Sequence, residues 1–200
     1  MSNGQYLSKK DLLKPENMIF LYSRGAFPMA DESGEINWYL PETRTIIPLQ
    51  RFNIPRSLKK FLSLSDFQFT YDSETLKVIE ECSKRESTWI SEELITAYNG
   101  LIALGHLHSV EVIQNRKLVG GLYGVTYKGA FFGESMFSKV SQASKCALVK
   151  LIERLIEKGF VLLDVQYQTD HLKMFGTEVI SFEQFNHQLE EAYKKELTFS

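Results

Sequence analysis

Apolar positions in the last two thirds of the chain recur with the periods of strands and helices. Alternation of apolar and polar residues predicts strands at 67–71, 108–114, 118–127 and 130–137. Apolar residues three and four apart predict amphipathic helices at 73–83 and 91–104, with Ser73 and Ser91 as N-caps. Polar segments at 115–117 and 128–129 predict hairpin turns between the later strands.

The pattern continues to the C-terminal end with two longer helices. The first covers 142–158 and is closed by Gly159, and the second begins at Ser181 with a capping box and runs to about Lys195. Between them we expect a strand at 160–166, a helical turn near 169–175 and a strand near 178–180. This order of elements predicts an α+β fold rather than a doubly wound α/β sheet.

The N-terminal third has a different sequence pattern. All five prolines of the chain fall within residues 1–66, where periodic segments are short. We expect a helix at 16–24, extended pieces at 38–39 and 45–47, and a helix from Pro55 to Phe61. The change in proline content and periodicity predicts a small N-terminal module, residues 1–66, followed by the main domain, residues 67–200.

Composition and charge exclude several classes of protein. The 200 residues carry a formal net charge of −2, which argues against a generally basic nucleic-acid coat. The two cysteines are far apart and form no disulfide or zinc pattern, so we expect a reducing, cytoplasmic setting. No apolar run is long enough to span a membrane, and the polar start of the chain does not resemble a signal peptide.

The strongest candidate for chemistry is a polar pair at the end of an apolar strand. Asp164 and Gln166 follow Leu162 at alternate positions, so the three side chains are expected on one face. A buried carboxylate is costly without hydrogen bonds, so the pair is expected to project into a cleft. The alternative is a strand end that reaches solvent.

A second candidate is Glu134, which lies among large apolar residues. Strict alternation would place Phe132, Glu134 and Met136 on one face, where burial would raise the pKa of Glu134 or require a donor. The alternative is an edge glutamate that points outward. The glycines at 120, 121 and 124 indicate a bulge or the close approach of another group, without a dinucleotide-binding spacing.

Histidine and basic residues offer weaker candidates. His106 and His108 lack a third ligand at useful spacing, so no metal site is predicted, whereas His171 is expected near the cleft of Gln166. A stretch without acidic residues supplies candidate contacts for the phosphates of a nucleic acid, with a solvated helix face as the alternative. These candidates are Arg44, Arg51, Arg56, Lys59 and Lys60.

Short motifs along most of the chain, taken together, resemble one known family. They include Gly25-Ala-Phe-Pro28, Trp38-Tyr39, Thr88-Trp89-Ile90, the stretch from Gly105 to Val112, Leu118 to Val125, Phe131 to Ser138, Ala143-Ser-Lys145, Asp164-x-Gln166 and His171-Leu172. Each block is weak alone, but their number, order and spacing resemble the leucyl/phenylalanyl-tRNA–protein transferase family. The resemblance covers roughly residues 20–185.

The resemblance implies a specific reaction. Such an enzyme moves Leu or Phe, and also Met, from aminoacyl-tRNA to the N-terminal α-amine of an acceptor protein, which creates an N-degron for protein degradation. The implied partners are aminoacyl-tRNA and acceptors beginning with Arg or Lys, with no membrane partner, and a monomer is adequate. No cofactor or metal is implied. The implied fold is a Gcn5-related N-acetyltransferase-like acyltransferase domain with a small N-terminal module.

The resemblance also assigns roles to residues by their positions in its motifs. Asp164 and Gln166 would be the catalytic pair, and Tyr39, Trp89 and Glu134 would bind the aminoacyl-adenosine. The pocket for the amino-acid side chain would be lined by Leu122, Phe131, Met136, Leu148, Leu151, Leu155 and Leu163. Two departures stand out: Tyr39 replaces a second tryptophan, and the family's longer glycine-rich N-terminal segment is absent here. We expect the second departure to affect the choice of acceptor.

Two other functions fit parts of the pattern. An acetyl-CoA-dependent N-acetyltransferase would share the fold, but residues 138–145 lack the glycines that such a pyrophosphate loop requires. A non-catalytic binder of RNA 3′ ends would use the same stacking aromatics without modifying a peptide.

Overall fold

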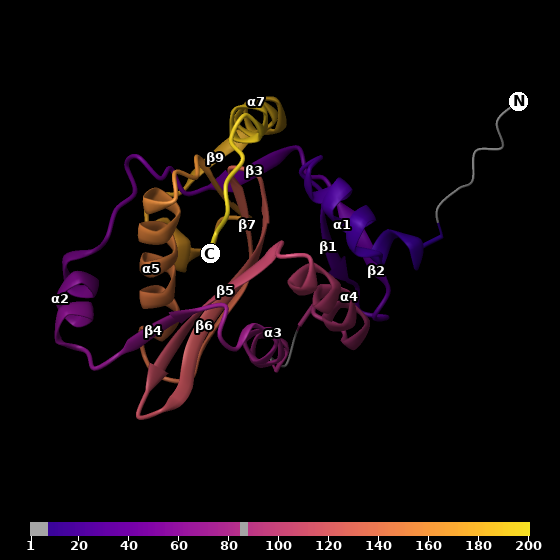
Figure 1. Cartoon of the computed structure of the whole chain (residues 1–200). Helices are drawn as coiled ribbons and strands as arrows, with labels where there is room; N and C mark the ends of the chain where they lie inside the picture. The colour runs from indigo at the N-terminus through magenta and orange to yellow at the C-terminus, as the bar shows by residue number, and fades with distance from the viewer. Residues whose placement is uncertain (1–7, 85–87) are drawn as a thin grey trace, which may run out of the picture.

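A computed structural model describes residues 8–84 and 88–200 as helices packed on both faces of a twisted sheet (Figure 1). In spatial order the seven strands of this sheet are β4 (Gln68–Tyr71), β5 (Leu107–Gln114), β6 (Lys117–Tyr127), β7 (Ala130–Ser138), β8 (Leu162–Gln166), β3 (Thr43–Ile46) and β9 (Glu178–Ser181). Neighbouring strands are antiparallel except β7 and β8, which run parallel. The predicted α+β class is confirmed.

Two groups of helices bury the two faces of the sheet. One face packs against α1 (Pro15–Tyr22), α3 (Thr75–Ser83), α4 (Glu92–Ala103) and α7 (Phe182–Tyr193). The other packs against α2 (Arg56–Leu64), α5 (Ala143–Glu157) and α6 (Asp170–Lys173). Each face therefore has its own apolar core, and α5 and α4 lie on opposite sides of the sheet (Figure 1).

Local signals in the sequence explain most element boundaries. The side chain of Ser91 accepts a hydrogen bond from the Leu94 backbone N–H, and Ser181 with Gln184 forms a full capping box, as predicted. Gly159 ends α5 in the left-handed region at φ 81°, a conformation that glycine adopts readily. The prediction for Ser73 is wrong: α3 begins at Thr75, with Glu74 at the N-cap.

The N-terminal residues contribute to the main sheet as well as forming a hairpin of their own. A short 3-10 helix, η1 (Asp11–Leu13), precedes α1, and β1 (Phe27–Ala30) pairs with β2 (Ile36–Tyr39) in a separate two-stranded sheet. β3 then enters the large sheet between β8 and β9. The division at residue 66 stays a prediction, but the sheet already takes a strand from the N-terminal side of that division. Within the part of the chain described, no helix is long and apolar enough to cross a membrane.

Candidate active site

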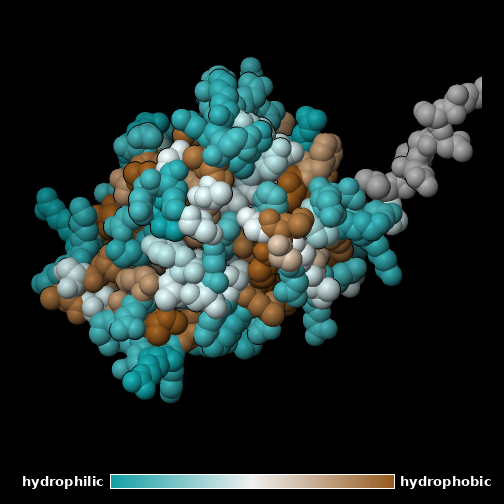
Figure 2. Space-filling view, in the orientation of Figure 1, coloured by the Kyte–Doolittle hydropathy of each residue, from teal (hydrophilic) through white to brown (hydrophobic). Residues whose placement is uncertain are grey.

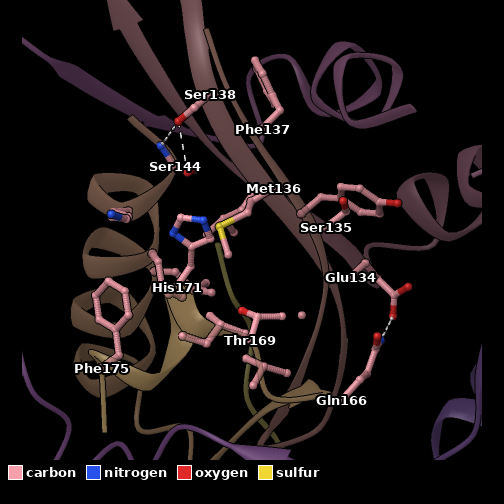
Figure 3. A pocket seen from close by; sticks show the side chains of 18 of the residues that line it. Glu134, Ser135, Met136, Phe137, Ser138, Ser144, Gln166, Thr169, His171 and Phe175 are labelled. Atoms are coloured by element: carbon pink, nitrogen blue, oxygen red, sulfur yellow. Dashed lines mark hydrogen bonds between the residues drawn. The ribbon is translucent and has the colours of Figure 1, made fainter. Parts of the chain in front are cut away.

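A cavity of about 870 Å³ opens where the two parallel strands of the sheet separate (Figure 3). β7 and β8 pair only as far as Phe132 and Asp164, after which β7 continues to Ser138 and β8 ends at Gln166. The cavity is lined by both strands, the N-terminal part of α5 and the segment around α6. Parallel strands that diverge in this way leave a gap in the sheet that reaches toward both apolar cores.

The wall on the α5 side is mainly apolar, although Gln142, Ser144 and Lys145 at the start of the helix also line the cavity. Five of the residues predicted for the amino-acid pocket line it: Leu122, Met136, Leu148, Leu151 and Leu163. The structure does not place Phe131 and Leu155 among the lining residues; both are fully buried in the core behind the cavity. Leu172 and Phe175, which follow β8, extend the apolar wall.

A β-bulge at Glu134 divides the residues of β7 between the α5 wall and the wall on the other side of the cavity. In the pairing of β6 with β7, Gly124 faces Gly133 and Tyr123 faces Ser135, so Glu134 is the extra residue. A side chain at Gly124 would collide with the carbonyl oxygen of Phe132, so glycine is needed beside the bulge. The expectation that Phe132 and Glu134 share one face is correct, because Phe132 packs against Tyr22 and Glu134 accepts from Tyr98 in the same core. It is wrong for Met136, which follows the bulge and packs against the core on the α5 side.

Glu134 is buried and accepts hydrogen bonds from two elements. The Tyr98 hydroxyl donates to Oε2 at 3.0 Å, and the Gln166 side-chain amide donates to Oε1 at 3.0 Å, as Figure 3 shows for Gln166. The hydroxyls of Tyr98 and Tyr22 lie 3.4 Å apart, which continues the chain into α1. Burial raises the pKa of Glu134 to about 8, against the lowering effect of the tyrosine hydroxyls.

Gln166 lines the cavity, whereas Asp164 is fully buried behind it. Asp164 Oδ1 accepts the backbone N–H of Gln166 at 2.9 Å. Gln166 has φ 63°, a left-handed conformation that costs a non-glycine residue on the order of 1–3 kcal/mol. The Asp164 carboxylate thus stabilises the turn that presents the Gln166 side chain to Glu134.

Arg44 is the partner of Asp164 and is equally buried. Its Nε donates to Asp164 Oδ1 at 3.2 Å, its Nη2 donates to Oδ2, and its Nη1 donates to the Gly25 carbonyl oxygen. The guanidinium lies between the rings of Phe27 and Phe185, 4.8 and 4.5 Å from their centroids. The prediction that Arg44 contacts tRNA phosphate is therefore wrong, because its side chain is entirely enclosed.

The other predicted phosphate contacts lie outside the core. Arg51 pairs with Glu178 at the surface, and Arg56, Lys59 and Lys60 are exposed on or at the start of α2. Figure 2 shows hydrophilic and hydrophobic residues side by side over α2, in keeping with the exposed Leu64 on this helix. These positions are accessible to an anionic partner.

The predicted adenosine-binding residues separate in space. Trp89 lines the cavity, as does His171, whereas Tyr39 does not and instead stacks on Phe27. His108 is held by Asp72 and the Gly105 carbonyl oxygen, which gives it a structural role. Among the described residues no group of three potential metal ligands comes together.

The sequence alone did not identify the three tyrosines that surround Glu134. Tyr22, Tyr98 and Tyr123 are all fully buried on the face opposite α5. A buried tyrosine usually needs a partner for its hydroxyl. Tyrosines at apolar positions of the predicted helices were therefore the available clue to hydrogen-bond donors for a buried acid. Arg44 gave a similar clue as the cation that a buried Asp164 requires.

Comparisons with known proteins agree with the resemblance. The family model described as "Leucyl/phenylalanyl-tRNA protein transferase" matches residues 46–190, and the one for its N-terminal domain matches residues 11–42. The chain belongs to the leucyl/phenylalanyl-tRNA–protein transferase family. The two matched regions meet at β3: the first ends at residue 42 and the second begins at residue 46. Arg44 on this strand joins the N-terminal region to β8.

Two curated relatives of this family are similar over most of their length. A leucyl/phenylalanyl-tRNA–protein transferase from Salinibacter ruber is 46% identical over 178 residues, which cover 87% of this chain and 79% of the relative. One from Herpetosiphon aurantiacus is 45% identical over 188 residues, which cover 94% and 98% respectively. The similarity therefore spans both walls of the cavity.

Proposed function

We propose that this protein transfers Leu or Phe from aminoacyl-tRNA to the N-terminal α-amine of an acceptor protein. The observation that carries the proposal is a single cavity with one apolar wall and one hydrogen-bonding wall, in a chain of this family. The apolar wall suits a Leu or Phe side chain, and Trp89 suits a stacked adenine. We expect neither a cofactor nor a metal, because the ester already supplies the driving force.

The buried groups suggest how the reaction is arranged. The incoming α-amine has an ordinary pKa of about 7.7–8.0, so roughly a tenth to a sixth of it is neutral at pH 7 and ready to attack. The Gln166 amide nitrogen donates to Glu134, which leaves its amide oxygen as an acceptor for an N–H of that amine. Holding the amine against the ester carbonyl accelerates the reaction mainly by proximity and orientation.

Asp164 has a different role in this proposal. Its carboxylate accepts bonds from Arg44 and from the Gln166 backbone and does not line the cavity, so it is a positioning residue. It fixes the turn at Gln166, and Arg44 balances its charge. The earlier expectation of a catalytic pair becomes a proposal in which Gln166 faces the substrates and Asp164 holds Gln166 in place.

The wider architecture supports two further parts of the proposal. The gap between parallel strands and the order of elements support a Gcn5-related acyltransferase type of fold. The exposed basic residues of α2 support a salt-dependent contact with tRNA phosphates. We further propose acceptors that begin with Arg or Lys, and a monomeric enzyme.

One experiment tests the reaction and the acceptor together. The protein is mixed with Leu-tRNA or Phe-tRNA and with peptides that begin with Arg, Lys, Asp or Glu, and the products are weighed by mass spectrometry. A mass gain of one Leu or Phe on the Arg and Lys peptides supports the proposal. No gain on any peptide would overturn it, and a gain confined to Asp and Glu peptides would overturn the acceptor preference.

The same assay separates the roles of the polar residues. Gln166→Ala is expected to lower kcat strongly while the fold is kept, because Gln166 faces the substrates. If Gln166→Ala transferred Leu as fast as the unaltered enzyme, the assignment of Gln166 would be wrong. Binding of an aminoacyl-adenosine analogue, but not of acetyl-CoA, would separate this function from that of an acetyltransferase.

A further inference from the structure

Two lysine ammonium groups meet at one carboxylate on the rim of the cavity. Lys84, directly after α3, and Lys139, directly after β7, pair with the same oxygen of Glu81, Oε1, at 2.9 and 2.8 Å. All three residues line the cavity. Because two positive charges share one negative charge, this lysine cluster, defined as Lys84, Lys139 and Glu81, keeps one positive charge in excess.

The lysine side chains of this cluster are open to solvent, whereas its carboxylate is not. The side chains of Lys84 and Lys139 are 64% and 48% exposed, against 12% for Glu81. Lys139 and then Lys84 hold the pKa of Glu81 below its usual value, so the carboxylate stays ionised and keeps the two lysines together. An ammonium group has three N–H donors and Glu81 accepts one from each lysine, so donors remain for an anion that enters the cavity.

The cluster lies on the same side of the sheet as the groups proposed to face the ester. Along β7 the polar groups of the cavity run from Glu134 to Ser138, as Figure 3 shows, and Lys139 is the next residue. The Nζ of Lys139 lies over the ring of Phe137, 5.8 Å from its centroid, and both Phe137 and Trp89 pack in the core opposite α5. Glu134 and Lys139 are about 15 Å apart along the strand, a span that a nucleoside and a lysine side chain can cover together.

The proposed substrate carries an anion directly beyond the adenosine. On the proposed function, the adenine stacks near Trp89 and the ester lies beside Glu134 and Gln166. The first charged group that follows along the tRNA is the phosphate that joins the terminal adenosine to the preceding nucleotide. Its oxygens carry negative charge and only accept hydrogen bonds, and a lysine ammonium is a compact charge that binds such oxygens. The lysine cluster therefore has the charge, the donors and the position for this phosphate.

We propose that Lys84 and Lys139 bind the 5′-phosphate of the terminal adenosine of aminoacyl-tRNA. This inference rests on the proposed function and adds a contact that an aminoacyl-adenosine alone would lack. It is separate from the basic face of α2, because Lys59 and Lys60 do not line this cavity. The contact would hold the 3′ end of the tRNA in place while the ester is attacked, and it would favour tRNA over a free aminoacyl-nucleoside.

The test compares two ligands that differ only in this phosphate. Both are amide-linked analogues of phenylalanyl-adenosine; one has a free 5′-hydroxyl, and the other has a 5′-methylphosphate, which carries the single charge of a phosphodiester. We expect the unaltered protein to bind the phosphorylated analogue about tenfold more tightly, which is the effect of a charge-assisted hydrogen bond. The double variant Lys84→Gln with Lys139→Gln should bind both analogues equally, and should bind the unphosphorylated one as well as the unaltered protein does.

A matched control and two further readouts distinguish this role from a structural one. Lys77→Gln removes a similarly exposed lysine of α3, which pairs with Glu74 and does not line the cavity, so this variant should keep the preference for the phosphorylated analogue. The double variant Lys84→Arg with Lys139→Arg keeps both charges and should keep most of the preference. Added salt should reduce the preference of the unaltered protein, because the attraction between exposed charges is screened.

The outcomes separate this inference from the proposed function. If the unaltered protein transfers Leu or Phe but binds the two analogues alike, only the phosphate contact is overturned. The contact is also overturned if the preference survives in Lys84→Gln with Lys139→Gln, if that variant weakens both analogues in parallel, or if Lys77→Gln loses the preference as well. If the unaltered protein neither transfers nor binds either analogue, the proposed function fails and the inference fails with it. Binding of acetyl-CoA that depends on both lysines would in that case assign the cluster to a phosphate of coenzyme A.

Discussion

The two walls of the cavity are built in contrasting ways. The α5 wall is formed mainly by apolar side chains of one helix, α5, and three strands, β6, β7 and β8. The opposite wall depends on irregular features: a bulge at Glu134, a left-handed residue at Gln166 and an ion pair with Arg44. On the proposed function, regular structure would select the amino-acid side chain, whereas irregular structure would place the groups that face the reacting ester.

The irregular wall should be the more sensitive to loss of a single partner. Arg44→Ala leaves the Asp164 carboxylate buried without its cation, which typically costs about 3–5 kcal/mol of unfolding free energy. The matched control, Arg51→Ala, removes an exposed pair with Glu178 and is expected to cost about 0–1 kcal/mol. Denaturant unfolding measures both, and equal costs would refute the contrast between buried and exposed pairs.

The regular wall can be tested by two substitutions on the same helix. Leu151 lines the cavity and Leu155, one turn later, is buried behind it. Changing either to Ala should destabilise the protein by about 2–5 kcal/mol. Only Leu151→Ala should enlarge the pocket and favour Phe over Leu, by about tenfold in relative kcat/KM. A similar shift from Leu155→Ala would mean that the pocket boundary has been misplaced.

The titration of Glu134 gives an effect on stability that depends on pH. The unfolded carboxyl titrates near 4.5 and the folded one near 8, so the unfolded state loses its proton first as pH rises. Stability is therefore expected to fall by up to about 1.4 kcal/mol per pH unit between these values, and to level off above pH 8. Besides burial, the ionisable groups that affect the pKa of Glu134 are the hydroxyls of Tyr98 and Tyr22, the Asp164 carboxylate and the Arg44 guanidinium.

Glu134→Gln provides the comparison for this titration. The variant lacks the ionisable group, so its stability should lack this slope between pH 5 and pH 8. Chemical unfolding at several pH values measures the difference between the two proteins. Parallel pH curves for the variant and the unaltered protein would show that Glu134 keeps an ordinary pKa.

The smallest effect on stability is expected at the basic face of α2. Lys59 and Lys60 are exposed, so replacing both with Ser should change unfolding free energy by no more than about 0.5 kcal/mol. If both contact phosphates, the slope of log binding constant against log salt should fall by about 2 in tRNA-binding titrations. Lys77→Ser on α3 is the control, and an equal change there would indicate general charge rather than a site.

The contrast between the walls also explains what the sequence could predict. The period of α5, the hairpins and the capping box at Ser181 specify local geometry, and they follow from residues close together in the chain. The α+β class could therefore be found from these signals, whereas the five pocket residues came from the resemblance to the family. Neither source indicated that Met136 turns to the other face, because period-two alternation contains no information about where a bulge inserts.

The prediction that Arg44 is exposed was wrong for a related reason. Its sequence neighbours suggest an exposed basic stretch, and only its long-range partner Asp164 shows that it is a core residue. The positions of the family motifs led to Glu134, Asp164 and Gln166, but those motifs did not state which of them touches the cavity. The separation of Gln166 from the enclosed Asp164 required three-dimensional geometry.

The pairing of Arg44 with Asp164 has a consequence for how the protein is made. The two residues are 120 positions apart, and the same guanidinium holds the Gly25 carbonyl oxygen. Contacts at such separation pay a loop-closure entropy and tend to form late in folding. While the chain leaves the ribosome, β3 must wait for β8, so the turn at Gln166 is completed only when nearly the whole chain has been synthesised. A chain that ends before β8 would lack both Leu163 of the α5 wall and Gln166, so on the proposed function it would present no working site to aminoacyl-tRNA.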